Sequence, residues 1–312
     1  MMKNIYILLF LFSLGVVAQS FLYQHQPNLF PIVDAPLNSE NHLPKKWRST
    51  KQISQLVGNY ANLKGLTQLH LSGSGQFSQE DLKNMSQEIK GKAVVLDLRE
   101  ESHGFIDGTP ISWTDGLNYG NVGKTLRQIE LDEQKRLKLT AQKGSIIVDL
   151  SKDLGENFQK FFVREVKTEK ELVESFGYTY IRLPITDHHR PVDSVVDQFI
   201  EIVLSLPADS WIHLHCKGGK GRTTTFMTLY DIMHNAQTVG LNDILSRQSL
   251  LGGSDLVQAE KNETYKQKPA KDRIEFIRAF YTYCREVPNF EMTWSDWVHQ
   301  KQLVAYQTSS SN

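Results

Sequence analysis

A cysteine and an arginine enclose three glycines in the segment His215-Cys216-Lys217-Gly218-Gly219-Lys220-Gly221-Arg222-Thr223. The glycines allow the backbone to curl with its N–H groups facing inward, and a helix starting after Arg222 adds the positive end of its dipole. Arg222 can hold two phosphate oxygens with its planar guanidinium, and the same positive field stabilises a Cys216 thiolate. The segment therefore predicts a phosphate-binding loop whose nucleophile is Cys216.

A glycine-rich turn that only closes the backbone, or that holds a nucleotide, is the alternative for this segment. A simple turn has no need of cysteine and arginine at this spacing, and a nucleotide-binding loop would end in Lys-Ser or Lys-Thr. Both features favour the phosphate loop with a nucleophile.

The loop needs a strand before it and a helix after it, and the sequence predicts both. Residues 211–215 form an apolar strand, and residues 223–235 continue as a helix. Further strands are expected at 93–98 and 178–183, and further helices from about residue 78, at 168–176, at 192–206 and at 272–287. Because strands and helices alternate, we expect an α/β core with a mostly parallel central sheet flanked by helices.

Two stretches depart from this alternation. Residues 100–121 contain so many turn-forming residues that we expect a long functional loop without regular structure. Residues 122–170 combine a polar helix near 125–135 with short β-type runs at 145–149 and 161–166, which indicates a small inserted β-rich subdomain. We divide the chain into a signal peptide (1–20), the N-terminal part of the core (21–121), the insert (122–170), the catalytic core (171–304) and a disordered tail (305–312).

The composition indicates a soluble globular protein and excludes a nucleic-acid binder steered by bulk charge. Of 312 residues, 40% are hydrophobic and 22% charged, which is typical of folded domains. Lys plus Arg and Asp plus Glu both number 35, so the formal net charge is zero. Any preference for anions must therefore be local.

The N-terminus has the pattern of an export signal. Lys3 precedes an apolar run at 5–12, and small residues at Ala18 and Ser20 bracket a cleavage point before Phe21. An uncleaved membrane anchor is the alternative, although the run is shorter than the ~20 residues that span a bilayer. We expect a periplasmic or secreted protein with no membrane span after cleavage.

Export would favour disulfide formation, but the chain has two cysteines only, Cys216 and Cys284. A structural disulfide is one interpretation, and a reversible regulatory bridge is another. The surroundings of Cys216 favour a free thiol, and Cys284 is then a buried apolar residue of a helix.

At this point the chain resembles the protein tyrosine phosphatase superfamily, whose signature is His-Cys, five variable residues, Arg, and Ser or Thr. His215, Cys216, Arg222 and Thr223 match it. The resemblance implies that the Thr223 hydroxyl assists departure of the Cys216 thiolate, and that an acid on a neighbouring loop protonates the leaving oxygen. Asp187 is the candidate, and its alternative is a turn or helix N-cap residue.

Several segments are similar to the phytase-like, or myo-inositol phosphatase, branch of that superfamily. They are Thr186-Asp187-His188, Asp97-Leu98-Arg99-Glu100-Glu101-Ser102-His103-Gly104-Phe105, Ser112-Trp113, Asn121-Val122-Gly123-Lys124, Arg247-Gln248, Gly252-Gly253, Phe280-Tyr281-Thr282-Tyr283 and Trp294-Ser295-Asp296-Trp297. Together the resemblance covers most of residues 45–300. It implies a protein tyrosine phosphatase-like core with an inserted partial β-barrel.

Basic residues around the loop indicate a substrate with several phosphates. Lys217 and Lys220 replace the acidic and apolar residues of many phytase-like members and resemble the loop of the phosphatase and tensin homologue family. Two ammonium groups at the rim would bind a crowded anion, although they could also serve general anion attraction. By resemblance, His188 and Arg48 contact substrate phosphate, and the backbone of Gly218, Gly219 and Gly221 cradles it.

We therefore predict a cysteine-dependent phosphatase acting on myo-inositol hexakisphosphate or lower inositol polyphosphates. A phosphoinositide or phosphotyrosine phosphatase, and a phosphate-binding module without turnover, are the alternatives. We expect neither a metal nor another cofactor, because the ten histidines show no zinc-type spacing with acidic partners. The basic run Lys266, Lys268, Lys271 and Arg273 is interpreted as solvated charge.

Overall fold

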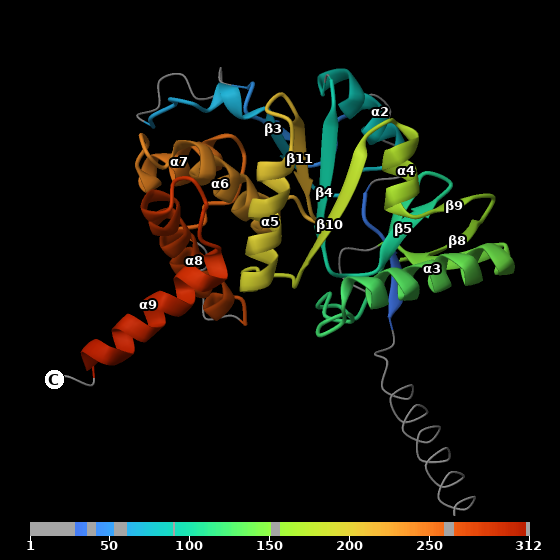
Figure 1. Cartoon of the computed structure of the whole chain (residues 1–312). Coiled ribbons are helices and arrows are strands. Elements are labelled where there is room, and N and C mark those ends of the chain that lie inside the picture. The colour runs from blue at the N-terminus through green and yellow to red at the C-terminus, as the bar shows by residue number, and fades with distance from the viewer. Residues whose placement is uncertain are drawn as a thin grey trace, which may run out of the picture.

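The computed structural model describes residues 29–35, 42–52, 61–89, 91–150, 157–258 and 265–309, with side chains described to residue 302. Two sheets and the helices around them make up this part of the chain (Figure 1). The fold class is confirmed as α/β. Within the described residues, no helix is long and apolar enough to cross a membrane.

The central sheet has five strands in the order β10-β4-β11-β3-β2. Its members are β2 (Arg48–Ser49), β3 (Leu71–Ser74), β4 (Ala93–Arg99), β10 (Thr179–Ile185) and β11 (Trp211–His215). Four strands run parallel, and only β2 at the edge is antiparallel to its neighbour β3. The expected mostly parallel sheet is confirmed, and the carboxyl ends of its strands meet at one edge, where active sites of such folds form.

Helices cover both faces of this sheet (Figure 1). One face carries α5 (Asp193–Ser205), α6 (Gly221–Asn235), α7 (Leu241–Leu250), α8 (Gln267–Glu286) and α9 (Trp294–Ser309), while the other carries α2 (Gln79–Glu88) and α4 (Glu169–Ser175). A short 3₁₀ helix, η2 (Thr67–Leu69), precedes β3. Strand β4 serves both faces because its residues alternate: Val94 and Leu96 pack against the first group, and Val95 against the second.

The second sheet has six strands in the order β8-β7-β1-β6-β5-β9 and packs beside α3 (Leu126–Lys143). Its strands are β1 (Phe30–Val33), β5 (His103–Ile106), β6 (Thr109–Thr114), β7 (Ser145–Asp149), β8 (Phe158–Phe162) and β9 (Val166–Lys167). The segment 122–170 supplies three of them, while β1, β5 and β6 come from residues before it. The expected division of the chain into segments stays a prediction.

Residues 100–121 correct one expectation, because they contain regular structure. Strands β5 and β6 pair antiparallel around Asp107 and Gly108, which both have positive φ, 48° and 78°. A two-residue Asp-Gly turn of this kind matches the twist of a hairpin. The expected loop therefore begins only after Thr114.

The two ends of the chain bear on the remaining expectations. The expected signal peptide, residues 1–20, lies outside the described residues, and export stays a prediction. Helix α9 continues to Ser309, so most of the segment expected to be a disordered tail has helical backbone.

Candidate active site

The glycine-rich loop joins β11 to α6 at the carboxyl edge of the central sheet. Strand β11 ends at His215, and α6 begins at Gly221. Cys216 is 3% exposed, and its sulfur lies 3.1 Å from the Thr223 hydroxyl, which donates to it. A hydroxyl that donates to the sulfur stabilises a thiolate there. This contact fits the predicted roles of the Cys216 thiolate, which attacks phosphorus in one step and departs from it in the next.

Outer contacts hold the loop in a curled shape. The backbone N–H of Gln76 donates to the Lys217 carbonyl at 3.1 Å, and the Arg48 guanidinium donates to the Gly219 carbonyl at 2.8 Å. These carbonyls point out of the loop, so its N–H groups are left for a ligand. Gly219 has φ of +67°, and a Cβ there would lie 2.3 Å from the Gly75 nitrogen. Only glycine fits this position.

Arg222 is fixed by two carboxylates. Its guanidinium makes paired contacts with the Glu101 carboxylate, at 2.7 and 3.0 Å, and lies 3.2 Å from the Asp187 carboxylate. Burial alone would lower the pKa of Arg222, but Asp187 and Glu101 raise it well above the usual value. The guanidinium is therefore a fixed positive charge, with a geometry suited to two phosphate oxygens.

Asp187 lies at the mouth of the loop with both carboxylate oxygens engaged. Oδ1 accepts from the His188 N–H at 3.0 Å and faces Arg222, while Oδ2 accepts from the Asn118 amide at 2.8 Å. Burial raises the pKa of Asp187, but Arg222, His188 and Asn118 outweigh it and hold the pKa below its usual value. A general acid must be protonated when it acts. A phosphate dianion bound to Arg222 would offset the positive charge that stabilises the Asp187 carboxylate, and the pKa of Asp187 would rise.

Asn118 was not predicted from the sequence, and it positions Asp187. Its amide oxygen accepts from the Thr114 hydroxyl at 2.9 Å and from Lys217 at 3.3 Å, which leaves the NH₂ group facing Asp187. Asn118 has φ of 64°, a conformation that asparagine tolerates better than most residues. It belongs to the loop after β6, where a functional role was expected.

Asn118→Ala should lower kcat for an inositol phosphate roughly 10- to 100-fold, because a hydrogen bond to a charged group is worth about 1.5–3 kcal/mol. The KM should change little. With p-nitrophenyl phosphate, whose leaving group needs no proton, the loss should be smaller. Equal losses on both substrates would contradict a role through Asp187.

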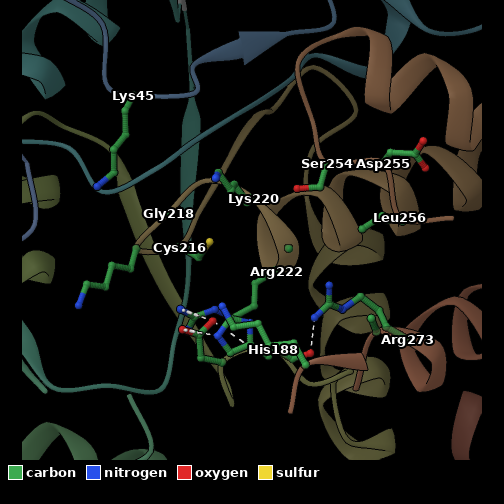
Figure 2. A pocket seen from close by; sticks show the side chains of 15 residues that line it. Lys45, His188, Cys216, Gly218, Lys220, Arg222, Ser254, Asp255, Leu256 and Arg273 are labelled. Carbon is green, nitrogen blue, oxygen red and sulfur yellow. Dashed lines mark hydrogen bonds and ion pairs between the residues drawn. The ribbon is translucent and has the colours of Figure 1, made fainter. Parts of the chain in front are cut away.

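The loop forms the floor of a cavity of about 590 Å³ (Figure 2). Six Lys and Arg residues line it, against two acidic residues, Asp187 and Asp255; the basic residues are Lys45, Lys217, Lys220, Arg222, Lys266 and Arg273. Lys45 and Arg273 lie on opposite sides of Cys216 in Figure 2. The cavity is larger than one phosphate requires and is positive over several of its walls.

The structure brings most of the predicted site residues to this cavity. Cys216, Lys217, Gly218, Lys220, Gly221, Arg222, Asp187 and His188 line it, and Thr223 lies directly beneath the sulfur. Burial lowers the pKa of His188, and nearby Lys266, Arg222 and Arg273 lower it further, although Asp187 opposes them. The lowered pKa favours the uncharged ring among these cations, and a ring N–H of His188 can donate a hydrogen bond to phosphate in either form.

Arg48 departs from its predicted role. It is fully buried, donates to the Gly219 carbonyl and to the Thr224 hydroxyl at 3.1 Å, and does not line the cavity. Its guanidinium therefore supports the loop from behind. The neighbouring cation that enters the cavity is Lys45, which the sequence interpretation overlooked.

Lys266 and Arg273 correct a second expectation, since both line the cavity rather than a solvated face. They lie seven residues apart, Lys266 at the N-cap of α8 and Arg273 within the helix, a spacing that places side chains on the same face. The Arg273 guanidinium also donates to the His188 carbonyl. The i, i+7 spacing predicts that the two side chains share one face of a helix. The sequence does not say that this face lines the cavity above the glycine-rich loop.

A family model described as protein tyrosine phosphatase-like phytase, inositol hexakisphosphate, matches residues 96–234. Among curated proteins, the effector protein hopD2 of Pseudomonas syringae pv. tomato is 31% identical over 264 residues, covering 80% of this chain and 56% of that protein.

Two solved structures are similar in sequence as well as in fold. One is a PTP-like phytase from Bdellovibrio bacteriovorus, with 32% identity, a TM-score of 0.70, and coverage of 88% of this chain and 96% of that one. The other is the PTP-like myo-inositol phosphatase from Mitsuokella multacida in complex with myo-inositol-(1,3,4,5)-tetrakisphosphate, with 32% identity and a TM-score of 0.82. That match covers 88% of this chain and 48% of the Mitsuokella chain. The chain thus spans about half the length of hopD2 and of the Mitsuokella protein.

Proposed function

Because the chain belongs to the protein tyrosine phosphatase-like phytase family, we propose that it is a phosphoric monoester hydrolase that acts on inositol polyphosphates. The observation that carries the substrate class is the cavity above Cys216, which has room beyond one phosphate and six basic residues in its lining. Phosphates at several positions of one small ring match that distribution of charge.

The first chemical step forms a phosphocysteine. The Cys216 thiolate attacks phosphorus, the bond between phosphorus and the ring oxygen breaks, and Asp187 gives its proton to the departing alkoxide. Inward N–H groups of the loop and the Arg222 guanidinium stabilise the equatorial oxygens throughout. The Arg222 contacts with Glu101 fix that guanidinium before the substrate arrives.

The second step releases phosphate. Asp187, now a carboxylate, takes a proton from water while the water oxygen attacks phosphorus, and the bond between sulfur and phosphorus breaks. The thiolate leaves with the Thr223 hydroxyl donating to it, a contact that is 3.1 Å long in the free protein. Protons and charges balance across both steps without a metal ion or another cofactor.

The test is a comparison of phosphate release from inositol hexakisphosphate, a soluble phosphoinositide and a phosphotyrosine peptide. We expect the highest kcat/KM for inositol hexakisphosphate, because it can engage the most cations of the cavity. Raising the salt concentration should reduce that advantage, since salt screens partly exposed charges. A clear preference for the peptide would contradict the proposed substrate, and no release from any of the three would favour a binding module without turnover.

A further inference from the structure

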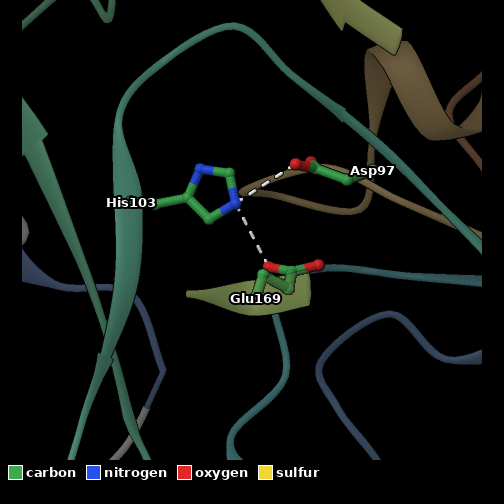
Figure 3. Close-up of side chains that lie close together, drawn as sticks. All are labelled: Asp97, His103 and Glu169. Carbon is green, nitrogen blue, oxygen red and sulfur yellow. Dashed lines mark ion pairs between the residues drawn. The ribbon is translucent and has the colours of Figure 1, made fainter. Parts of the chain in front are cut away.

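A buried group of side chains connects the second sheet to the residue before the nucleophile. Glu169, the first residue of α4, has one carboxylate oxygen 2.6 Å from His215 Nε2 and the other 3.2 Å from His103 Nε2. His103 Nε2 lies also 3.2 Å from the Asp97 carboxylate (Figure 3). All four residues are at most 1% exposed, and none lines the cavity.

His103 carries a proton on each ring nitrogen. Its Nδ1 lies 2.8 Å from the Glu101 carbonyl oxygen, which can only accept a hydrogen bond, and 3.3 Å from the Arg182 guanidinium, which can only donate. The shorter contact with the carbonyl assigns a hydrogen to Nδ1. Its Nε2 faces the carboxylates of Asp97 and Glu169, and a lone pair there would repel both. Burial and Arg99 lower the pKa of His103, but Asp97 and Glu133 outweigh them and raise it to about 10. His103 is therefore an imidazolium.

Three buried guanidinium groups balance most of the nearby carboxylates. Arg99 pairs with Asp34 and Glu101, Arg182 pairs with Asp97 and Glu133, and Arg222 pairs with Glu101 and Asp187. Within the described part of the chain, the ion pairs of Glu169 are with two histidines, His103 and His215. The Glu169 carboxylate thus lies closest to those two rings.

The same oxygens that face His103 are already used by other donors. The Asp97 oxygen accepts from the Tyr180 hydroxyl at 2.8 Å and lies 3.2 Å from Arg182 Nε. The Glu169 oxygen accepts from the Gln76 amide at 2.8 Å. A proton on His103 completes this arrangement, whereas a cation between the three residues would compete with the Arg182 charge.

We propose that Glu169 is a positioning residue that stabilises positive charge on His215, beside the nucleophile, and that His103 holds Glu169 in place. The proposal rests on the nucleophilic role proposed for Cys216. It links the second sheet to the nucleophile, because β5 of that sheet supplies His103, and Glu169 begins the helix α4 that directly follows β9.

The surroundings of His215 support a dominant influence of Glu169. Asp97 is the second carboxylate near the ring, but it lies farther away, at 3.8 Å, and is paired with Arg182. The other rings packed on His215 are those of Phe77, 4.9 Å away, and His213, 6.2 Å away. Burial lowers the pKa of His213 well below its usual value, and the neighbouring His215 and Arg48 add to this effect although Glu169 opposes it, so that ring is neutral. Positive charge beside Cys216 favours its thiolate.

The test measures alkylation of Cys216 by iodoacetamide as a function of pH, in the full chain, with the labelled site located by peptide mapping. In Glu169→Gln the midpoint of the alkylation profile should move to higher pH by on the order of one unit. Glu133→Gln is the matched control. Glu133 is 4% exposed, pairs with Arg182 at 2.9 Å and lies 3.7 Å from His103 Nδ1, but it contacts neither Glu169 nor His215. Because Asp97 and Glu169 still face His103 Nε2 in Glu133→Gln, the midpoint should stay close to the wild-type value.

Loss of stability alone cannot produce this difference, because both variants remove one buried carboxylate of the same network. A third variant, Glu169→Asp, keeps the charge and should keep the wild-type midpoint. If Glu169→Gln does not fold, Glu169→Asp is compared with wild type instead, and a midpoint raised by about one unit would contradict the proposal. An unchanged or lowered midpoint in Glu169→Gln, or a shift of the same size in Glu133→Gln, would overturn the proposal. So would a stoichiometric metal in the purified protein whose removal shifts the wild-type profile.

Alkylation needs no substrate, so its outcome is separate from that of the proposed function. If wild type releases no phosphate from inositol hexakisphosphate, the proposed function fails, whereas the midpoints still decide the role of Glu169. Burial raises the pKa of Cys284, so its thiol does not compete for the reagent.

Discussion

Cys216→Ser should lower kcat for inositol hexakisphosphate by on the order of 10⁴-fold or more, while the variant still binds the substrate. The cysteine sulfur lies beneath the cavity and accepts from the Thr223 hydroxyl, so a serine oxygen can occupy nearly the same volume. A serine hydroxyl is not ionised at neutral pH, and the nearby Asp187 carboxylate is held by Arg222, Asn118 and the His188 N–H. The loop N–H groups and Arg222 remain to hold phosphate.

Binding by Cys216→Ser can be measured by titration calorimetry with inositol hexakisphosphate, alongside phosphate release. We expect a Kd close to the wild-type KM and an unchanged melting temperature. Cys284→Ser is the control for loss of a thiol. Cys284 lies on the buried face of α8 in the hydrophobic core, so this substitution should leave turnover unchanged. Turnover by Cys216→Ser at the wild-type rate would exclude the proposed nucleophile.

Asp187→Asn should lower kcat for inositol phosphates by about 10²- to 10⁴-fold, the usual contribution of a general acid. The asparagine amide can keep a hydrogen bond to Asn118, but it has no proton to give to an alkoxide. Phosphorylation of Cys216 by p-nitrophenyl phosphate should be affected far less, because nitrophenolate leaves without protonation. Pre-steady-state measurement of the nitrophenolate burst tests this directly.

The pH profile gives a second readout of the same variant. Arg222, His188 and Asn118 hold the pKa of Asp187 below its usual value in the free protein, so its acid form is lost as pH rises through that low pKa. In wild type, kcat/KM for inositol hexakisphosphate should therefore fall on the alkaline side of an acidic optimum. Asp187→Asn should lack this fall, and an alkaline limb that survives the substitution would assign it to another group.

The catalytic loop could be predicted because its reactive residues and the strand and helix that position them are adjacent in the sequence. An apolar strand, a glycine loop and a helix follow one another without interruption, and the structure has β11 and α6 at those places. The helix starts before Arg222, two residues earlier than expected, which places that guanidinium in the first turn. Three predicted helices also begin at capping boxes, at Ser78, Thr125 and Thr168.

The hairpin of β5 and β6 was missed although a local signal was present. The many turn-forming residues of 100–121 indicated a loop, but Asp107-Gly108 between two alternating segments is a strong hairpin signal. The strands also gain their stability from partners far along the chain. β6 pairs with β1, and β5 pairs with β9, so the pattern within residues 103–114 was only part of the information.

The roles of the basic residues could not be assigned from the sequence. Lys45 and Arg48 lie in one short segment, and the left-handed conformation of Lys46, with φ of 58°, separates their directions. Arg48 then enters β2 beside Gly73 and reaches the back of the loop, whereas Lys45 faces the cavity. Glu169 begins α4 and His103 begins β5, and the fold brings their side chains to 3.2 Å from each other. No spacing in the sequence predicts this contact.

In the proposed mechanism, hydrolysis passes through a phosphoryl group on Cys216. The direct measurement is mass spectrometry of the wild-type protein after rapid acid quench during turnover of inositol hexakisphosphate, with mapping of the modified peptide. We predict the mass of one phosphoryl group on Cys216 in wild type and none in Cys216→Ser. Steady release of phosphate with no modification of Cys216 at any quench time would exclude a phosphocysteine intermediate.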